Sequence, residues 1–419
     1  MLKYVLLYIY KEVKSMETIL NRGYKFKIKP NKEQKEFLLK SFGCSRKVYN
    51  YYVDSLYNKL ENQKYENGKL PNIILESPAT LKNKFEYLKE VDPLALCNAQ
   101  ISFKKAMKKF NSQKDKKSYK KSAKRREKNL GIAPSFKDLK GIPKFKSIKN
   151  SDFSYTTNNQ SRGGKWKDIE LNADLLYLPK LKTPIKVVKH RDLPQGAIIK
   201  NSTISMDSKG VFTVSLCVEF TKDIYKKQPL KTLGLDYAQQ DFYYSSEDKK
   251  ANYPKYYRLS EEKLAKEQRK LSRKIKCSNN WEKQKKKISK LHKKIANQRL
   301  DWIHKESTKI CNEFDAIIFE DIDLSNMAQC LSLGKNLHDN GFGMFRNFCK
   351  YKLEEQGKQF IKIDMWFPSS KLCSSCGVIN DNLELSDRVW ECPTCGSIHN
   401  RDYNASINIK EAGQSLLAW

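Results

Sequence analysis

The sequence has no long apolar segment and little negative charge for its size. Nothing in its 419 residues approaches the roughly 18 apolar residues of a membrane-spanning helix, which excludes a membrane span. The stretch "YVLLYIY" (residues 4–10) is apolar, but it is short, ends at Lys11 and lacks the small-residue cleavage site of a secretory signal. We expect residues 1–15 to be a non-essential N-terminal extension, with translation beginning at Met16.

Acidic residues are the scarcer charge. The chain has 81 Lys and Arg against 47 Asp and Glu, a formal net charge of +34 and an isoelectric point near 9.6. Positive charges in such excess repel one another unless a polyanion neutralises them. Nucleic acid is therefore the first candidate partner and an acidic membrane surface the second. The length predicts two or three domains and is ample for a real core.

Eleven cysteines would suit a disulfide framework, but the sequence has no secretion signal to support one. Seven are scattered, and we interpret them as reduced, mostly buried thiols: Cys44, Cys97, Cys217, Cys277, Cys311, Cys330 and Cys349. The other four form two C-x2-C pairs separated by fifteen residues, Cys373 with Cys376 and Cys392 with Cys395.

Each C-x2-C pair directs two thiolates to one point, and the loop between the pairs lets them share a tetrahedral site. We therefore predict one Zn²⁺ ion, structural because four thiolates leave no open coordination position. Two disulfides and a redox C-x-x-C pair are the alternatives. A reducing compartment argues against the first and the paired spacing against the second. His399 lies just beyond the cluster and is interpreted as a bystander.

The N-terminal half mixes helical and β-type patterns. Residues 24–30 predict a strand, and Asn31 is a candidate N-cap for the long helix that follows. A second helix near residues 95–109 leads into the basic segment 108–129, which we interpret as lining a phosphate backbone in preference to a solvated charge run. Residues 141–220 predict a small antiparallel barrel or sandwich that the opening strand joins, so the helices are an insertion. Its expected strands are "GIPKFK", "DFSYTT", "PIKVVKH", "IKNSTISMD" and "GVFTVSLCVEF".

The C-terminal half alternates strands with helices, which predicts an α/β domain. "TLGLD" (residues 232–236) and "AIIFE" (residues 316–320) are buried-type strands. Between them, residues 260–314 predict two basic amphipathic helices with a turn near residues 278–280. The Lys-rich outer face of these helices favours contact with nucleic acid; a plain helical hairpin or coiled coil is the alternative. A helix near residues 344–356 and a strand at residues 359–367 complete the pattern.

Three carboxylates stand out in this basic chain. Asp236 and Glu320 each end an apolar strand, so each should emerge at a sheet edge, and Asp402 is expected near a helix start. Singly, each has an ordinary explanation as an N-cap, a salt-bridge partner or a strand-end charge. Together, in a protein that binds nucleic acid, they predict ligands for two Mg²⁺ ions roughly 4 Å apart that promote in-line phosphodiester displacement. Asp321 and Asp323 are interpreted as surface or capping residues.

Three C-terminal motifs are highly specific: "FPSSKLCSSCG" (residues 367–377), "WECPTCG" (residues 390–396) and "NRDYNASINI" (residues 400–409). They resemble the TnpB family, transposon-encoded RNA-guided DNA endonucleases related to the type V CRISPR effectors. Upstream, "KLAKEQRKLSRK", "HKKIANQR", "IIFEDI" and "GFGMFRNFCKYKLEEQG" extend the resemblance, as more loosely does "KPNKEQKEFLLKSFGCSRKVYN". It therefore covers most of the chain after Tyr24.

The resemblance implies a fold and a division of labour. It implies an α/β, RuvC-like nuclease domain of RNase H fold with a zinc-ribbon insertion, preceded by an OB-like wedge β-barrel domain that carries a helical recognition lobe. Asp236, Glu320 and Asp402 match the catalytic acids of the family. The implied partners are a guide RNA and double-stranded, then unwound, target DNA, with base pairing supplying sequence specificity and a short adjacent motif read in the duplex. We expect a cytoplasmic, nucleoid-associated prokaryotic protein, with a monomer favoured.

The implied domain boundaries follow the motifs. Residues 16–30 and 131–228 form the wedge domain and residues 31–130 the recognition lobe. Residues 229–366, with a helical hairpin at 258–314, and residues 399–419 form the nuclease domain around a zinc ribbon at 367–398.

The sequence departs from the family pattern at two positions. Ala238 replaces a common Gly, and Asn400 replaces the first Asp of a common Asp-Arg-Asp motif. Ala is small and the metal-binding acid is the second, so catalysis is expected to persist, which argues against a nuclease-inactive RNA-guided repressor. A compact type V CRISPR effector and a transposase remain alternatives. Nucleic-acid contacts are expected from Arg401, equally interpretable as a surface cation, and from Lys104, Lys105, Lys108, Arg125 and Arg126.

Overall fold

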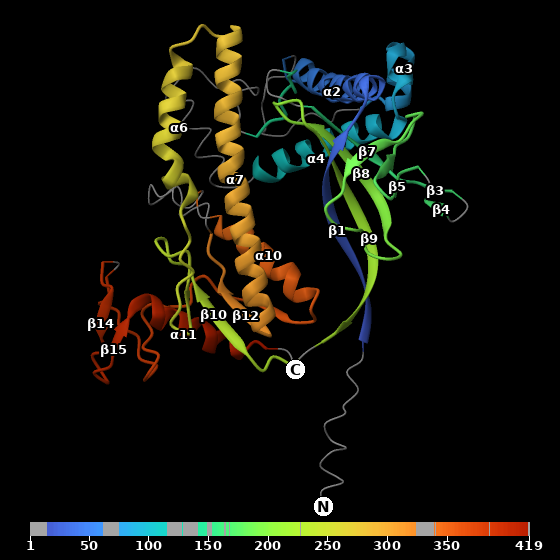
Figure 1. The fold of residues 1–419 in the computed structure, drawn as a ribbon. Helices are drawn as coiled ribbons and strands as arrows, with labels where there is room; N and C mark the ends of the chain where they lie inside the picture. Colours follow the sequence, from blue (N-terminus) through green and yellow to red (C-terminus); the bar gives the residue numbers. More distant parts are fainter. Residues whose placement is uncertain are drawn as a thin grey trace, which may run out of the picture. The chain divides into compact units, whose positions relative to one another are not determined.

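The computed structural model describes residues 15–61, 75–114, 128, 141–148, 153–162, 165–166, 168–226, 228–323, 339, 341–384 and 386–417 (Figure 1). The chain forms two compact units, Ile19–Lys222 and Asp223–Trp419, the second grouped with Met1–Thr18. The proposed extension up to residue 14, Cys330, Arg125 and Arg126 lie outside the described residues. In the part that is described, no helix has the length and apolar character needed to cross a membrane.

A sheet organises the first unit, with its described strands in the order β2-β8-β9-β1-β7-β6-β5. Alternate residues of β9 ("FTVSLCVEF") point into the core, from Phe212 to Phe220. The opening strand joins this sheet, as predicted. The bounds are β1 Ser15–Lys29, β2 Ser154–Asn158, β5 Glu170–Asn172, β6 Leu175–Tyr177, β7 Ile185–Val188, β8 Ile198–Met206 and β9 Phe212–Tyr225, beside a small hairpin of β3 Ser161–Arg162 and β4 Lys165–Trp166.

The sheet curls so that its two edge strands come together. Asn159 directly follows the edge strand β2, and its side-chain amide donates to the carbonyl of Ile169 at 3.0 Å. The Asn159 side-chain oxygen accepts from the backbone N–H groups of Asp168 and Ile169, just before the other edge strand, β5. One buried amide therefore satisfies backbone groups where the ladder of strand hydrogen bonds is interrupted.

Between β1 and β2, the described residues are mostly helical. The helices that they form include α2 Lys32–Glu61, α3 Pro78–Lys84, the 3-10 helix η1 Glu86–Glu90 and α4 Pro93–Lys114. The predicted N-cap is confirmed: Asn31 accepts from the backbone of Gln34 at 2.8 Å, and the Gln34 side chain accepts from the backbone of Asn31 at 2.8 Å. The helices therefore interrupt the sheet-forming sequence as an insertion, as expected.

The predicted strand "GIPKFK" is wrong. Residues 141–146 have an irregular conformation because side chains of α2 bind their backbone. Asn50 donates to the carbonyl of Lys146 and accepts from its N–H, at 2.9 and 2.8 Å, and Tyr57 donates to the carbonyl of Pro143 at 3.0 Å. These contacts replace the strand partners that the alternating pattern suggested.

The second unit is a sheet with helices on both faces. Its strands lie in the order β11-β10-β12-β13, with β10–β12 and β12–β13 parallel. Ile317 and Phe319 of β12 pack with helices α7 (Asn279–Glu313) and α10, whereas Ile318 between them packs with Ile409 of α11. Both faces are covered, which explains why "AIIFE" is apolar at four consecutive positions. The bounds are β10 Thr232–Asp236, β11 Tyr244–Ser245, β12 Ala316–Glu320, β13 Gln359–Ile363, α10 Phe342–Glu354 and α11 Arg401–Gln414.

The predicted helical hairpin is confirmed as α6 Tyr256–Ser272 and α7 Asn279–Glu313 (Figure 1). Ser278 begins α7 as an N-cap, because its hydroxyl accepts from the backbone of Trp281 at 3.1 Å. The buried Gln284 of α7 donates to the backbone carbonyl and to the carboxylate of Glu267 in α6, at 2.9 and 2.7 Å. These polar bonds hold together two helices whose outer surfaces are mostly Lys and Arg.

Candidate functional site

The structure brings the three predicted carboxylates to one edge of the second sheet. Asp236 ends β10 and Glu320 ends β12, and Leu235 lies opposite Phe319 in this parallel pair, so the two acids leave neighbouring strands side by side. Asp402 lies in the first turn of α11, whose N-terminus is capped by Asn400. All three carboxylates are half-buried.

Two glycines allow α11 to lie directly on the sheet. A side chain at Gly234 in β10 would overlap the carbonyl oxygen of Ser406 and lie 2.7 Å from the backbone nitrogen of Lys410, both in α11. A side chain at Gly413 in α11 would overlap Ile318 of β12. This close approach places the start of α11, and with it Asp402, at the edge where the two strands end.

The carboxylates interact electrostatically. Burial, and then the negative charges of Glu320 and Asp402, raise the pKa of Asp236 well above its usual range. Burial raises the pKa of Glu320 to about 6, against a hydrogen bond from the hydroxyl of Ser369 at 3.4 Å that favours the ionised form. Burial and the neighbouring carboxylates therefore disfavour a free negative charge on Asp236, and a bound cation would relieve this.

Arginines surround the carboxylates. Arg388 lies 3.6 Å from Asp402, and Arg346 donates to the backbone carbonyl of Glu320 at 3.2 Å and lies 3.6 Å from Asp321. The charge of Arg401 lowers the pKa of Asp236, while its guanidinium donates to the carbonyl of Glu384 at 3.3 Å.

Sequence reasoning missed Arg388, Arg346 and Ser369. The serine lies within the motif "FPSSKLCSSCG" and Arg346 within "GFGMFRNFCKYKLEEQG", so both had a signal there, but nothing in the linear sequence pointed to Arg388. Asp321 pairs with Lys362 at 2.7 Å and half of its side chain is exposed, in agreement with its interpretation as a surface residue.

The four predicted cysteines come together. Their four sulfur atoms all lie within 4.8 Å of one another, close enough to bind one metal ion. The sulfurs of Cys373 and Cys395 are 3.7 Å apart and those of Cys376 and Cys392 are 3.6 Å apart. A tetrahedral zinc site with Zn–S bonds of about 2.3 Å separates its sulfurs by about 3.8 Å, so the donor set fits zinc.

His399 lies on β15 (Ile398–Asn400), which pairs with β14 (Val389–Glu391) beside the cysteines. Its Nε2 is 3.1 Å from the sulfur of Cys373, and burial lowers its pKa. With four thiolates present, it is a contact of the cluster and not a needed ligand.

Side-chain amides of α11 connect this cysteine cluster to the carboxylate edge. Asn404 donates to the carbonyl of Leu372 at 2.7 Å and accepts from the backbone of Ser374 at 2.9 Å. Asn408 donates to the carbonyls of Ser369 and Leu372, at 2.8 and 2.6 Å. Helix α11, which carries Asp402, therefore holds the backbone of Leu372, next to the first cysteine, and of Ser369, whose hydroxyl binds Glu320.

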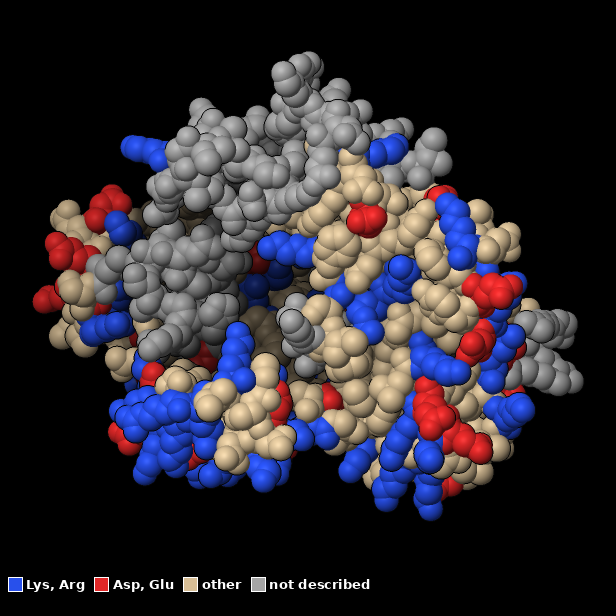
Figure 2. Space-filling model, turned by 90° about the horizontal axis from the view of Figure 1, so that it is seen from above, with Lys and Arg blue, Asp and Glu red and all other residues tan. Residues whose placement is uncertain are grey.

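The other predicted contact residues lie elsewhere. Lys104, Lys105 and Lys108 are exposed on α4, in the first unit. Lys and Arg side chains are abundant on the face drawn in Figure 2 and are interspersed with fewer Asp and Glu. Such a surface suits the phosphate backbone of a nucleic acid.

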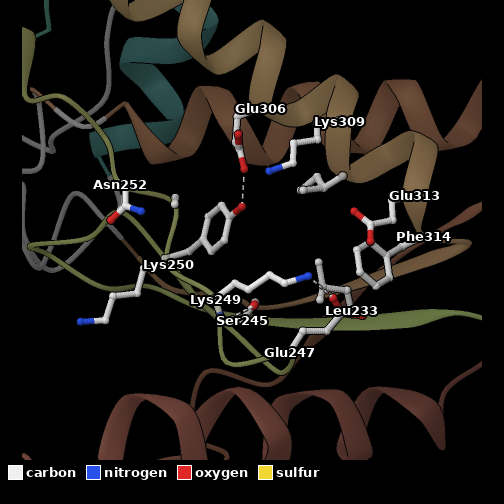
Figure 3. A pocket seen from close by; sticks show the side chains of 13 residues that line it. Leu233, Ser245, Glu247, Lys249, Lys250, Asn252, Glu306, Lys309, Glu313 and Phe314 are labelled. Carbon is white, nitrogen blue, oxygen red and sulfur yellow. Dashed lines mark hydrogen bonds and ion pairs between the residues drawn. The ribbon is translucent and has the colours of Figure 1, made fainter.

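A cavity of about 350 Å³ in the second unit does not include the three acids. Its lining is drawn in Figure 3, where Lys249 pairs with Glu247 at 2.9 Å. Tyr243 also lines the cavity, and its hydroxyl donates to the carboxylate of Glu306 at 2.5 Å. Two further lining groups pair with residues outside the lining, Lys250 with Asp241 and Glu313 with Lys231, and we do not assign the cavity to the site.

Replacing Gly234 with Ala is expected to destabilise the second unit by roughly 3 kcal/mol, because the new methyl group meets α11 backbone that cannot rotate away. Urea unfolding measures the change. Gly43→Ala in α2 is the matched control: its added carbon meets nothing within 4 Å, and we expect a gain of about 0.5–1 kcal/mol. Equal unfolding midpoints for Gly234→Ala and wild type would show that α11 does not depend on this close approach.

Three families match parts of this chain. They are described as "Helix-turn-helix domain" over residues 16–64, "Probable transposase" over residues 215–331 and "Cas12f1-like, TNB domain" over residues 342–409. In the described part of the first range, this chain forms the strand β1 and the single continuous helix α2.

Individual relatives align over much longer stretches. A Streptomyces pristinaespiralis protein named "Putative RNA-guided DNA endonuclease" is 30% identical over 403 residues, which cover 95% of this chain and 91% of the relative. Escherichia coli K12 InsQ, which bears the same description, is 29% identical over 300 residues, 68% of this chain and 71% of InsQ. The solved structure titled "Cryo-EM structure of the Cas12f1-sgRNA-target DNA complex" is 13% identical with a TM-score of 0.48, over 94% of this chain and 99% of that one.

An alignment over nearly the whole length of both proteins accounts for both units of the chain. The relative that it covers is named as a putative RNA-guided DNA endonuclease. The chain belongs to the TnpB family, which confirms the resemblance drawn from the C-terminal motifs.

Proposed function

We propose that this protein is a Mg²⁺-dependent, RNA-guided DNA endonuclease that hydrolyses phosphodiester bonds at Asp236, Glu320 and Asp402. The observation that carries the proposal is the convergence of these acids, from two strand ends and one helix start, on a single sheet edge. Membership of the TnpB family supplies the class of reaction.

The carboxylates suit divalent cations, because burial and then the charges of Glu320 and Asp402 raise the pKa of Asp236, and a cation would favour its ionised form. Asp236, Glu320 and Asp402 would hold two Mg²⁺ ions, which would supply an activated water and charge stabilisation for the attacking and leaving oxygens of the phosphate. The protein orients its carboxylates for that task. Ser369 fixes one oxygen of Glu320, and Arg346 holds the backbone beneath it.

The arginines have a separate task, because phosphate is itself an anion. Arg388 and Arg401 lie beside the acids, where they can receive a DNA phosphate whose charge would otherwise be repelled. Arg388 pairs with Asp402, and 68% of its side chain is exposed, so it is free to turn toward a substrate.

Zinc has a structural role in this proposal. Cys373, Cys376, Cys392 and Cys395 would hold it in a ribbon at residues 367–398, and four thiolates leave no position for substrate. Because Asn404 and Asn408 bind the backbone at the base of this ribbon, the metal stabilises the position of Asp402 indirectly.

The rest of the chain would bind the guide RNA and the target. We assign the curled sheet to an OB-like wedge domain, residues 31–130 to a recognition lobe and the second unit to a RuvC-like domain of RNase H fold. The net charge of +34 supplies the attraction for two nucleic acids. Guide–target pairing then supplies sequence specificity, while the protein contacts the nucleic-acid backbone and recognises the shape of the duplex. We place this activity in the prokaryotic cytoplasm, at the nucleoid.

The test is to purify the protein with co-expressed RNA, sequence that RNA, and incubate the complex with Mg²⁺ and plasmids carrying a matching or a scrambled target. We expect linear product from the matching plasmid alone. The description "Probable transposase" raises strand transfer as a second activity, so products are also examined for joined ends. Absence of bound RNA contradicts the guided function, and joined products without free ends contradict hydrolysis.

A further inference from the structure

We propose that Trp366 is a stacking platform for an unpaired base of the DNA strand at the carboxylate site. The inference rests on the proposed function and deepens it, because it names how the strand is held beside the acids. Trp366 is 83% exposed, whereas Trp281 and Trp302 are half-buried and Trp390 is buried. Single exposed apolar residues are common on proteins, so the argument depends on where this one lies.

The loop that carries Trp366 runs from Ile363 to Ser369, and both of its ends lie beside Glu320. It begins after Ile363, which lies opposite Glu320 in the β12–β13 pair and accepts from the N–H of Asp321 at 3.1 Å. It ends at Ser369, whose hydroxyl donates to the Glu320 carboxylate at 3.4 Å. Trp366 is midway between them, and three residues of chain can carry it at most about 11 Å from Ile363.

The loop holds its shape on both sides of the indole. The Asp364 carboxylate accepts from the backbone of Trp366 at 2.7 Å, and the Asp364 carbonyl accepts from Phe367 at 3.2 Å. Phe367 is partly buried and packs on the apolar cluster between the sheet and α11, and its carbonyl accepts from Ser369 at 2.7 Å. The backbone is therefore anchored while the indole remains in solvent, together with Met365, which is 43% exposed.

A nucleobase is the ligand that fits this position. DNA bound for cleavage must bring a phosphate to the carboxylates, so a base of the same strand comes within reach of a loop anchored on Glu320. Indole stacks on any base, because every base has a π-face, and this suits an enzyme whose specificity comes from a guide. Arg346 and Lys362 lie beside Asp321 at the start of the same loop, where they favour the strand's phosphates over an acidic protein surface.

Stacking can be measured without cleavage. In the Glu320→Gln background, the RNA-bound protein is mixed with matching DNA carrying 2-aminopurine at successive positions along each strand. We expect fluorescence quenching at about one or two neighbouring nucleotides, kept in Trp366→Tyr and lost in Trp366→Leu, which retains apolar bulk without a ring. Quenching that is the same in Trp366→Leu as in the parent protein overturns the proposal.

The cleavage rate provides a second readout. In the otherwise wild-type protein we expect Trp366→Leu to slow cleavage about tenfold and Trp366→Tyr to recover most of the rate. Leu259→Ala, on α6 and 76% exposed, is the matched control and should cut at the wild-type rate. Equal cutting by Trp366→Leu and wild type overturns the proposal, as does a change confined to self-association in gel filtration. If wild type does not cut but the Trp366-dependent quenching is present, the stacking site stands and the proposed function fails.

Discussion

Replacing Asp236 with Asn is expected to reduce DNA cleavage by about 10³-fold or more, because a ligand worth several kcal/mol of transition-state stabilisation is lost. The same change should raise the free energy of unfolding, measured without Mg²⁺, by about 1 kcal/mol. The physical reason is that this buried carboxylate is repelled by Glu320 and Asp402, and the amide has no charge to repel. Plasmid cleavage and urea unfolding of one preparation give both numbers.

The combination separates a catalytic role from structural damage. Replacing a residue needed only for folding would lower both the cleavage rate and the free energy of unfolding. Asp236→Asn should lower the cleavage rate and raise the free energy of unfolding. Asp241→Asn is the matched control, because its carboxylate pairs with Lys250 at 3.1 Å. It should keep the cleavage rate and gain no stability. An Asp236→Asn protein that cuts at the wild-type rate removes this residue from the site.

Replacing Cys392 with Ser is expected to lower bound zinc from about one ion per chain to almost none. Cys392 is buried among the other thiols, and three remaining sulfurs leave the site incomplete. Cleavage should then fall about 100-fold or more, because the ribbon no longer supports the backbone at Ser369 and Leu372 that binds Asn408 of α11. Elemental analysis and hydrogen exchange across residues 373–395 measure the metal and the local opening.

Cys277→Ser is the control for this experiment. Cys277 is exposed in the turn between α6 and α7, far in sequence from the cluster. Its substitution should leave zinc content and cleavage unchanged. If Cys392→Ser retains zinc, the four-thiolate assignment is wrong. If zinc is lost but cleavage continues, the ribbon does not support the carboxylate edge.

Features with a strong local cause could be predicted from the sequence. "AIIFE" predicted a buried strand, and the structure confirms it in a parallel sheet that α7 and α11 cover on opposite faces. Asn31 and Gln34 form the reciprocal cap that their spacing suggested. The cysteine spacing predicted a cluster because the short loop between two C-x2-C pairs lets all four thiolates reach one metal ion.

Features that depend on distant parts of the chain could not be predicted. "GIPKFK" alternates like a strand, but side chains of Asn50 and Tyr57, nearly a hundred residues earlier, bind its backbone first. Arg388 meets Asp402 only because β14 and α11 are brought together by the fold. Gly234 gave no signal within "TLGLD", since the need for it arises from the helix that crosses the strand.

The most direct test of the carboxylate site compares Glu320→Gln with Asp321→Asn in the guided plasmid assay. The two residues are adjacent, but Glu320 is at the sheet edge with Asp236 and Asp402, whereas Asp321 pairs with Lys362 and Arg346 at the surface. We expect Glu320→Gln to bind RNA and matching DNA normally and to leave the plasmid uncut, while Asp321→Asn cuts at close to the wild-type rate. Equal cutting by Glu320→Gln and wild type would contradict the account.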